Sequence, residues 1–258
     1  MSQKIYFISD LHLGLDEPTV GRERERLIVS WLDEIKSDAA ELFLLGDVFD
    51  FWYEYKKVIL KGHTRFLGKL AEISDSGIPI HYFIGNHDLW AKNYLTEELG
   101  VKIYQEPEVF DRMGKKIFIG HGDGLGPADH QYKFLKKIFT NPFLQWAFRW
   151  LHPDIGVWLA HSWSHKSRYQ YHNVRSFGGE QEWLIQFARE ELRKEHYDYF
   201  LFGHRHYPIH YPLNEQSTYI NLGDWLTQFH YACLDPSGME LKRYEPGKDW
   251  LASQPPKP

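Results

Sequence analysis

The chain opens with the stretch Ile5-Tyr6-Phe7-Ile8-Ser9-Asp10-Leu11-His12, which contains the pattern that decides the fold. Ile5–Ile8 is a short run of β-branched and aromatic residues, typical of a buried strand. Asp10 and His12, which can both bind a metal ion, follow within four residues of its end. The pattern recurs four more times: Leu42–Leu45 precedes Asp47, Ile80–Ile84 precedes Asn86, His87 and Asp88, Ile117–Ile119 precedes His121, and Tyr199–Phe202 precedes His204 and His206.

Segments with helical spacing and charged faces lie between the early strands, at Arg22–Lys36 and Thr64–Ser74. Strand–helix alternation of this kind predicts an α/β layered sandwich. The alternation stops between Leu125 and His172, where we predict two or three helices separated at Pro142 and Pro153. The remaining predictions are a helix near Glu180–Lys194 and possible hairpin strands at Ser217–Leu222 and His230–Leu234.

Composition excludes several classes of protein. The 258 residues are 43% hydrophobic and 25% charged, which is ordinary for a soluble globular protein with a substantial core. A formal net charge of −5 argues against a general nucleic-acid binder. The single cysteine, Cys233, excludes an intramolecular disulfide. No signal-peptide pattern and no run of about 18 apolar residues occurs, so we expect a cytoplasmic protein without a membrane span.

The polar residues after the five strands are expected to meet. In open α/β sheets, ligands bind at the carboxyl ends of the strands, so the five loops would converge on one site. Four of the loops place glycine directly before the first donor, which permits a tight turn and close backbone approach. A lone histidine or Gly-Asp is usually an ordinary turn residue. Five such turns, each at the end of a strand, indicate a metal site.

The donor types indicate which metal ions fit. The candidate ligands offer oxygen and nitrogen without thiolate, which suits Mn²⁺, Fe²⁺ or Zn²⁺ in a catalytic site. They are too many for one ion but fit two ions that share a bridging carboxylate. Such a site keeps a net positive charge, so it attracts phosphate and lowers the pKa of a bound water. The seven candidates are Asp10, His12, Asp47, Asn86, His121, His204 and His206.

The motifs Asp-x-His, Gly-Asp, Gly-Asn-His-Asp, Gly-His and Gly-His-x-His, in this order, resemble the calcineurin-like metallophosphoesterases. The resemblance implies a four-layer α/β/β/α sandwich: one domain over 1–258 with a helical cap inserted at about 125–172. It implies that Asp10, His12 and His206 bind one metal, that Asn86, His121 and His204 bind the other, and that Asp47 bridges them. His87 and Asp88 would be catalytic, with His87 facing the phosphate and Asp88 orienting its imidazole.

Over its whole length the chain is similar to the bacterial UDP-2,3-diacylglucosamine hydrolases, on Ser9–Leu13, Leu45–Asp50, His121–Asp123 and the helical insertion. That resemblance implies Mn²⁺-dependent cleavage of a UDP-linked diacyl sugar lipid to UMP and 2,3-diacylglucosamine 1-phosphate, by a hydroxide held between two metals. It also implies peripheral contact with the cytoplasmic face of the inner membrane. The implied substrate contacts are Asn86, His87, Asp129, Tyr132, Ser164, Lys166 and Arg168.

Two features leave alternatives open. The insertion is crowded with aromatic and cationic residues, which predicts either a cap that encloses acyl chains or an ordinary amphipathic helical pair that packs on the core. His87 stands where the better-known branch of these hydrolases carries arginine, which leaves room for a broader phosphodiesterase or phosphomonoesterase acting on another lipid or nucleotide. A non-catalytic scaffold of the same fold is the third reading. Scaffolds of this kind should have lost ligands, whereas here the motif set is intact.

Overall fold

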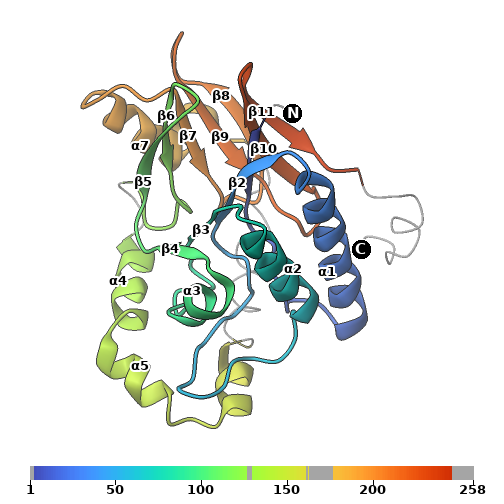
Figure 1. Cartoon of the computed structure of the whole chain (residues 1–258). Helices are drawn as coiled ribbons and strands as arrows, with labels where there is room; N and C mark the ends of the chain where they lie inside the picture. Colours follow the sequence, from blue (N-terminus) through green and yellow to red (C-terminus); the bar gives the residue numbers. More distant parts are fainter. Residues whose placement is uncertain (1–2, 127–129, 161, 163–176, 246–258) are drawn as a thin grey trace.

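The computed structural model describes residues 3–126, 130–160, 162 and 177–245, except the side chains of residues 130–132 and 134. Its centre is a pair of mixed β-sheets that lie face to face (Figure 1). The first has the strand order β11-β10-β1-β2-β3-β4, and the second has the order β5-β6-β7-β9-β8. In the first sheet β1 to β4 run parallel, whereas β10 pairs antiparallel with both β1 and β11.

The strands of the first sheet are β1 (Lys4–Ile8), β2 (Ala39–Leu45), β3 (Ile80–Phe83), β4 (Lys102–Tyr104), β10 (His230–Asp235) and β11 (Gly238–Arg243). Those of the second are β5 (Glu108–Arg112), β6 (Lys115–Ile119), β7 (Tyr199–Phe202), β8 (Pro208–Pro212) and β9 (Thr218–Leu222). The helices α1 (Pro18–Ile35), α2 (Thr64–Asp75) and α3 (Tyr94–Leu99) follow strands of the first sheet. The short η1 (Gly179–Gln181) and α7 (Trp183–Leu192) precede β7 in the second.

Three separate hydrophobic cores define four layers. Alternate residues of a strand point to opposite faces of its sheet, and β1 shows this directly: Tyr6 and Ile8 pack with α1 and α2, whereas Ile5 and Phe7 pack between the sheets. The third core lies between the second sheet and α7, where Leu184, Phe200 and Phe202 belong to one buried cluster. The order is therefore helices, sheet, sheet, helix, which confirms the predicted α/β/β/α sandwich.

Two expectations about the secondary structure need correction. Ser217–Leu222 and His230–Leu234 do not pair with each other, because β9 and β10 belong to different sheets. Each forms a hairpin with a strand that the sequence did not reveal: β8 with β9, and β10 with β11. The first helix also begins earlier than expected, at Pro18, where proline suits the first helical turn because its missing N–H has no partner there.

Between β6 and η1 the chain forms helices that are not part of the layers on either sheet. They are α4 (His130–Phe139), α5 (Pro142–Phe148) and a helix over residues 153–160, together called the cap helices. Figure 1 shows them at the lower end of the molecule, away from α1 and α7. Trp90 Nε1 donates to the Phe139 carbonyl at 2.6 Å, and Tyr53 Oη donates to the Gln145 carbonyl at 2.8 Å. Loops that follow β2 and β3 thus hold the cap helices. Among the described helices, none is both long and apolar enough to cross a bilayer.

Candidate metal centre

The loops that end β1, β2 and β7 hold their polar residues in an unusual backbone conformation. Asp10, His12, Asp47, His204 and His206 have positive φ, between 43° and 67°. They make up five of the eight described non-glycine residues with positive φ. Side chains disfavour this left-handed region, and residues that adopt it cluster at functional sites. The strained positions therefore coincide with the predicted ligands.

The glycines before the ligands allow the loops to approach each other closely. A Cβ atom on Gly203 would lie 2.5 Å from Asp10 Oδ2, and one on Gly85 would collide with the carboxylate and amide of Asp47. Main-chain hydrogen bonds then lock the loops together, from Asp10 N to Gly46 O at 3.1 Å and from His12 N to Asp47 O at 3.0 Å. The Gly-ligand spacing in the sequence thus reflects a packing requirement.

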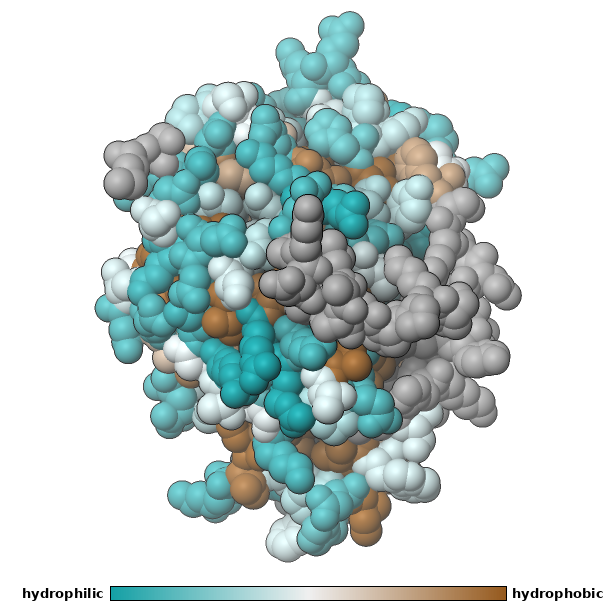
Figure 2. Space-filling model, turned by 90° about the vertical axis from the view of Figure 1, so that its right-hand side faces the viewer, coloured by the Kyte–Doolittle hydropathy of each residue, from teal (hydrophilic) through white to brown (hydrophobic). Residues whose placement is uncertain are grey.

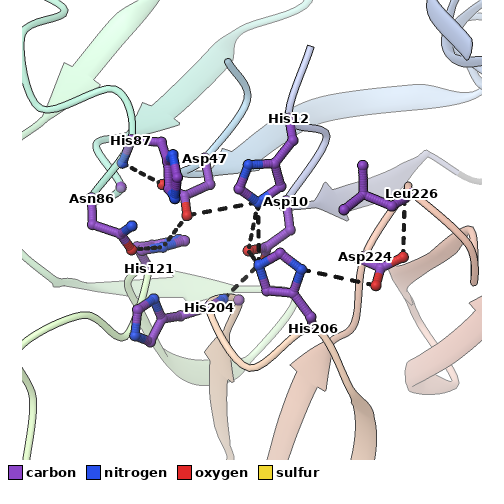
Figure 3. Close-up of polar contacts among 12 residues, drawn as sticks. Asp10, His12, Asp47, Asn86, His87, His121, His204, His206, Asp224 and Leu226 are labelled. Atoms are coloured by element: carbon purple, nitrogen blue, oxygen red, sulfur yellow. Dashed lines mark hydrogen bonds and ion pairs between the residues drawn. The ribbon is translucent and has the colours of Figure 1, made fainter. Parts of the chain in front are cut away.

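Four donors from three loops form the first group. Asp10, His12, Asp47 and His206 each offer one atom, and all four atoms lie within 4.8 Å of one another. His206 Nε2 is 3.2 Å from Asp10 Oδ1 and 3.2 Å from His12 Nε2 (Figure 3). Oxygen and nitrogen ligands of one ion, each about 2.1 Å from it, stand roughly 3 to 3.5 Å apart. The spacing fits a single bound cation.

A second group shares Asp47 with the first. Asp47, His121 and His204 again offer atoms within 4.8 Å of one another. His121 Nε2 lies 3.3 Å from Asp47 Oδ2 and 3.2 Å from the side-chain oxygen of Asn86. The structure therefore brings all seven predicted ligands together. Their arrangement in two groups that overlap at one carboxylate is consistent with a dinuclear site.

One oxygen of each aspartate is held by the backbone, which leaves the other for the centre. Asp10 Oδ2 accepts from His204 N at 3.0 Å, and Asp47 Oδ1 accepts from His87 N at 2.8 Å. Asp10 Oδ1 is buried and has no hydrogen-bond donor in the described part of the chain. A buried anionic oxygen without a donor is costly. A divalent cation would satisfy it, so these residues fit a metal site.

Ring orientations also suit metal binding. His121 Nδ1 lies 2.7 Å from the Leu45 carbonyl, which can only accept, so Nδ1 carries the proton. Nε2 is then the nitrogen that faces Asp47 and Asn86, where a metal ion would take its lone pair. A metal-binding histidine is commonly fixed by such a hydrogen bond through its other nitrogen.

Burial and charge set the protonation of the site. Burial lowers the pKa of His206 to about 3 and also lowers the pKa of His204, which leaves lone pairs on both rings. Burial raises the pKa of Asp47, but His121 and His87 outweigh it, so the net pKa lies well below the usual range. Burial lowers the pKa of His121, yet Asp47 dominates and raises it well above its usual value. A proton on His121 thus balances Asp47 where no cation does, and a bound metal would displace it.

Asp88 does not orient His87, contrary to the sequence-based expectation. Its carboxylate accepts from Gly85 N at 2.7 Å, from Val48 N at 2.9 Å and from Tyr82 Oη at 2.5 Å. His87 Nδ1 instead donates to the Asp50 carbonyl at 2.9 Å. Asp88 therefore joins the loops after β2 and β3. Its burial, with the nearby charge of Asp47, raises its pKa to about 6.

The expected substrate contacts are placed only in part. Asn86 and His87 lie at the metal centre, and the side chain of His87 is 17% exposed to solvent. Tyr132 belongs to α4, but its side chain lies outside the described residues. Asp129, Ser164, Lys166 and Arg168 also lie outside the described residues.

Sequence reasoning missed several residues beside the centre. Asp224 Oδ1 accepts from Leu226 N at 3.0 Å, while Oδ2 lies 3.9 Å from His206 Nδ1 (Figure 3). The run Leu222-Gly223-Asp224 repeats the strand-Gly-Asp pattern and could have revealed it. The buried Arg24 donates from Nη2 to the His12 carbonyl at 2.9 Å. No local motif marks Arg24, because its role depends on how α1 packs.

Comparisons with known proteins identify the family. The model for the calcineurin-like phosphoesterases matches residues 3–208. A UDP-2,3-diacylglucosamine hydrolase from Porphyromonas gingivalis is 36% identical over 259 residues, covering 95% of this chain and 99% of that protein. One from Pseudomonas aeruginosa is 28% identical, covering 91% and 96%. The solved phosphoesterase Yfce from E. coli is 14% identical with a TM-score of 0.44, covering 90% and 88%. The chain belongs to the calcineurin-like phosphoesterases and is a metal-dependent phosphoester hydrolase.

Proposed function

We propose that the chain hydrolyses the pyrophosphate of UDP-2,3-diacylglucosamine, releasing UMP and 2,3-diacylglucosamine 1-phosphate. One observation carries the chemistry: the buried Asp47 belongs to both donor groups, as the bridging ligand of a two-metal site must. The similarity to the Porphyromonas gingivalis hydrolase over nearly the whole of both chains supports the substrate.

In this proposal the two ions divide the seven donors. Asp47 would bind both ions. The remaining ligands would be Asp10, His12 and His206 for one ion and Asn86, His121 and His204 for the other. Two divalent ions would lower the pKa of a bound water and neutralise charge that develops on the phosphate. Mn²⁺ is the proposed metal, with Fe²⁺ and Zn²⁺ as alternatives, because imidazole and carboxylate ligands accept all three.

His87 is the proposed catalytic side chain that moves a proton. Its Nδ1 is committed to the Asp50 carbonyl, so Nε2 is the atom left to meet the substrate. Burial lowers the pKa of His87, so Nε2 carries a lone pair in the resting protein and can accept a proton. Once protonated, Nε2 can donate to a phosphate oxygen or to the leaving group. Asn86 and His87 would both contact the substrate.

The cap supports a lipid substrate. Eight of the twelve large hydrophobic side chains that are exposed in the described part lie between residues 143 and 159. Figure 2 shows hydrophobic surface at the lower end of the molecule, where Figure 1 places the cap helices. We propose that the insertion at 125–172 is a cap on a single domain over 1–258, and that it accepts the two acyl chains. Exposed aromatics beside Arg149 also suit peripheral contact with the cytoplasmic face of an inner membrane.

A turnover assay tests the proposal. Purified protein with Mn²⁺ is given UDP-2,3-diacylglucosamine or bis-p-nitrophenyl phosphate, and UMP or nitrophenol is measured. We expect UMP release in strong preference to nitrophenol, and neither product from Asp47→Ala. An active Asp47→Ala that keeps its metal would contradict the two-metal site.

The second candidate is a broader phosphodiesterase or phosphomonoesterase, which His87 in the motif Gly-Asn-His-Asp favours. Rapid nitrophenol release without UMP would select it and discard the lipid substrate. A scaffold without catalysis would release neither product. The complete donor set opposes that reading.

A further inference from the structure

Asp50 is a buried acidic residue that the proposed chemistry does not yet use. It lies three residues after Asp47, in a loop that runs beside residues 10–13. His12 N donates to the Asp47 carbonyl at 3.0 Å, and Asp50 N donates to the Leu13 carbonyl at 3.0 Å. The Asp50 side chain has no exposed surface. This pairing of loops fixes its carboxylate against His12.

The two ring nitrogens of His12 face different partners. Nε2 points at the first donor group, 3.2 Å from His206 Nε2 and 3.8 Å from Asp10 Oδ1. Nδ1 is buried and lies 3.4 Å from Asp50 Oδ1. A metal-binding imidazole needs its lone pair on the nitrogen that faces the ion, so the other nitrogen carries the proton. Nδ1 makes no hydrogen bond in the described part of the chain, and Asp50 Oδ1, 3.4 Å away, is the carboxylate oxygen that faces it and could accept that proton.

The same residue also holds His87. Its carbonyl oxygen accepts from His87 Nδ1 at 2.9 Å, and its Oδ1 lies 3.6 Å from the same nitrogen. The rings of His12 and His87 meet edge to face with centroids 4.8 Å apart. Asp50 therefore lies against the Nδ1 side of both rings and leaves both Nε2 atoms turned away from it.

We infer that Asp50 is a positioning residue that orients two histidines: the metal ligand His12 and the phosphate-facing His87. The inference rests on the proposed roles of these two histidines. It makes metal affinity and turnover depend on a side chain that lies outside the two donor groups that share Asp47, although it clusters with His12 and His87. The carboxylate acts on His12, whereas the main-chain carbonyl, which no side-chain substitution removes, continues to hold His87. Substitution should therefore affect metal binding more than the chemical step.

The test measures Mn²⁺ binding to metal-free protein by the EPR signal of free Mn²⁺. Loss of a group that orients a metal ligand typically weakens metal affinity by about 10- to 100-fold, which is the expectation for Asp50→Ala. Asp50→Asn keeps an oxygen acceptor of the same shape without the charge, so its loss should be smaller. We also expect kcat, measured at saturating Mn²⁺ on whichever diester is turned over, to fall less than the affinity.

Glu25→Gln is the matched control. Glu25 is another buried carboxylate, but it accepts from Arg65 N at 2.9 Å and Phe66 N at 3.1 Å at the start of α2. Its substitution removes the same charge and should lower the melting temperature while leaving Mn²⁺ affinity within about twofold. A purely structural role for Asp50 would give this same result in Asp50→Ala.

His12→Ala separates the failure of this inference from the failure of the proposed function. If His12→Ala loses Mn²⁺ affinity while Asp50→Ala and Asp50→Asn both keep it within twofold, the positioning role is wrong and the ligand set stands. If His12→Ala also binds two Mn²⁺ ions normally, the ligand set itself is wrong. Should Asp50→Ala fail to fold, Asp50→Asn decides the question, because normal Mn²⁺ affinity in that variant also overturns the inference.

Discussion

Helices α7 and α5 have similar apolar content but opposite surroundings. In α7, Leu184, Ile185 and Ala188 are buried against the second sheet. In α5 no residue is buried, and Phe143 and Trp146 are 68% and 53% exposed. Apolar area left in water forgoes about 25 cal/mol per Å² of stabilisation. The sandwich therefore obtains its stability from helices such as α7, whereas the apolar face of α5 adds little to folding and is available to a ligand.

This difference in burial suggests that the sandwich and the cap helices have different functions. The four layers bring five loop ends into one buried site, where small displacements would separate the donors. The cap helices contact those loops through a few hydrogen bonds and an aromatic group, in which the rings of Tyr53 and Phe148 lie 4.9 Å apart. We expect variants in the sandwich to change metal binding or stability, and variants on the cap to change only the choice of substrate.

The largest expected effect comes from the site itself. Asp47→Ala removes the carboxylate shared by both donor groups, so turnover should fall by roughly 10³-fold or more. Metal content, measured by ICP mass spectrometry after dialysis, should fall with it. Circular dichroism should still report a folded sandwich. Retained activity with two bound metals would remove the basis for assigning catalysis to the sandwich.

A matched pair of substitutions tests the stability difference. Ile185 on α7 is fully buried, whereas Leu144 on α5 is 43% exposed. Ile185→Ala should reduce the free energy of unfolding by about 2–5 kcal/mol, because it leaves a cavity in the third core. Leu144→Ala should change it by less than about 0.5 kcal/mol. Denaturant unfolding followed by tryptophan fluorescence measures both, and equal losses would mean that the two helices do the same work.

The sequence predicted a layered α/β sandwich and the seven candidate ligands because both depend on local patterns, whereas the four-layer order came from the family resemblance. A central strand is a run of buried residues, as in Ile5–Ile8, and a ligand loop is a glycine followed by a donor. Edge strands carry no such signal: β5 buries only Phe110, and β4 is three residues long. The orienting role of Asp88 was implied by the family resemblance, and the structure does not show it, because the carboxylate of Asp88 is occupied by other donors. The hydrogen bonds of Asp88 go to Val48 and Tyr82 instead.

The cap is the region where substrate choice should be decided. Trp150 is the most exposed of its large hydrophobic side chains, at 76%. If it contacts acyl chains, Trp150→Ser should raise KM for UDP-2,3-diacylglucosamine by roughly tenfold, the equivalent of about 1.4 kcal/mol of lost apolar contact. Turnover of bis-p-nitrophenyl phosphate, which has no acyl chain, should stay the same. Equal losses on both substrates would show that the cap acts on the metal centre rather than on the lipid.

The smallest expected effect concerns how the stability of the sandwich and of the cap helices depends on acidic side chains. Glu41, on the inner strand β2 of the first sheet, accepts from Arg112 Nε of β5 at 2.5 Å and lies 2.9 Å from His81 Nε2. Burial raises the pKa of Glu41, but the hydrogen bonds from His81 and Arg112 outweigh it and lower the pKa below 4.5. Because the folded pKa is the lower one, the charged pair stabilises the fold above the pKa of the unfolded chain. That contribution is lost as the pH falls through the folded pKa.

Glu41→Gln should therefore reduce the free energy of unfolding by about 0.5–1 kcal/mol near neutral pH. The difference from wild type should shrink as the pH falls below about 4.5. The carboxylate of Asp154, on the helix over 153–160, is 94% exposed, so Asp154→Asn should change the free energy of unfolding by less than about 0.5 kcal/mol near neutral pH. Urea unfolding at a series of pH values measures both. A constant difference for Glu41→Gln would mean that the charge pair between β2 and β5 does not stabilise the sandwich, and the contrast with the cap would then rest on apolar burial alone.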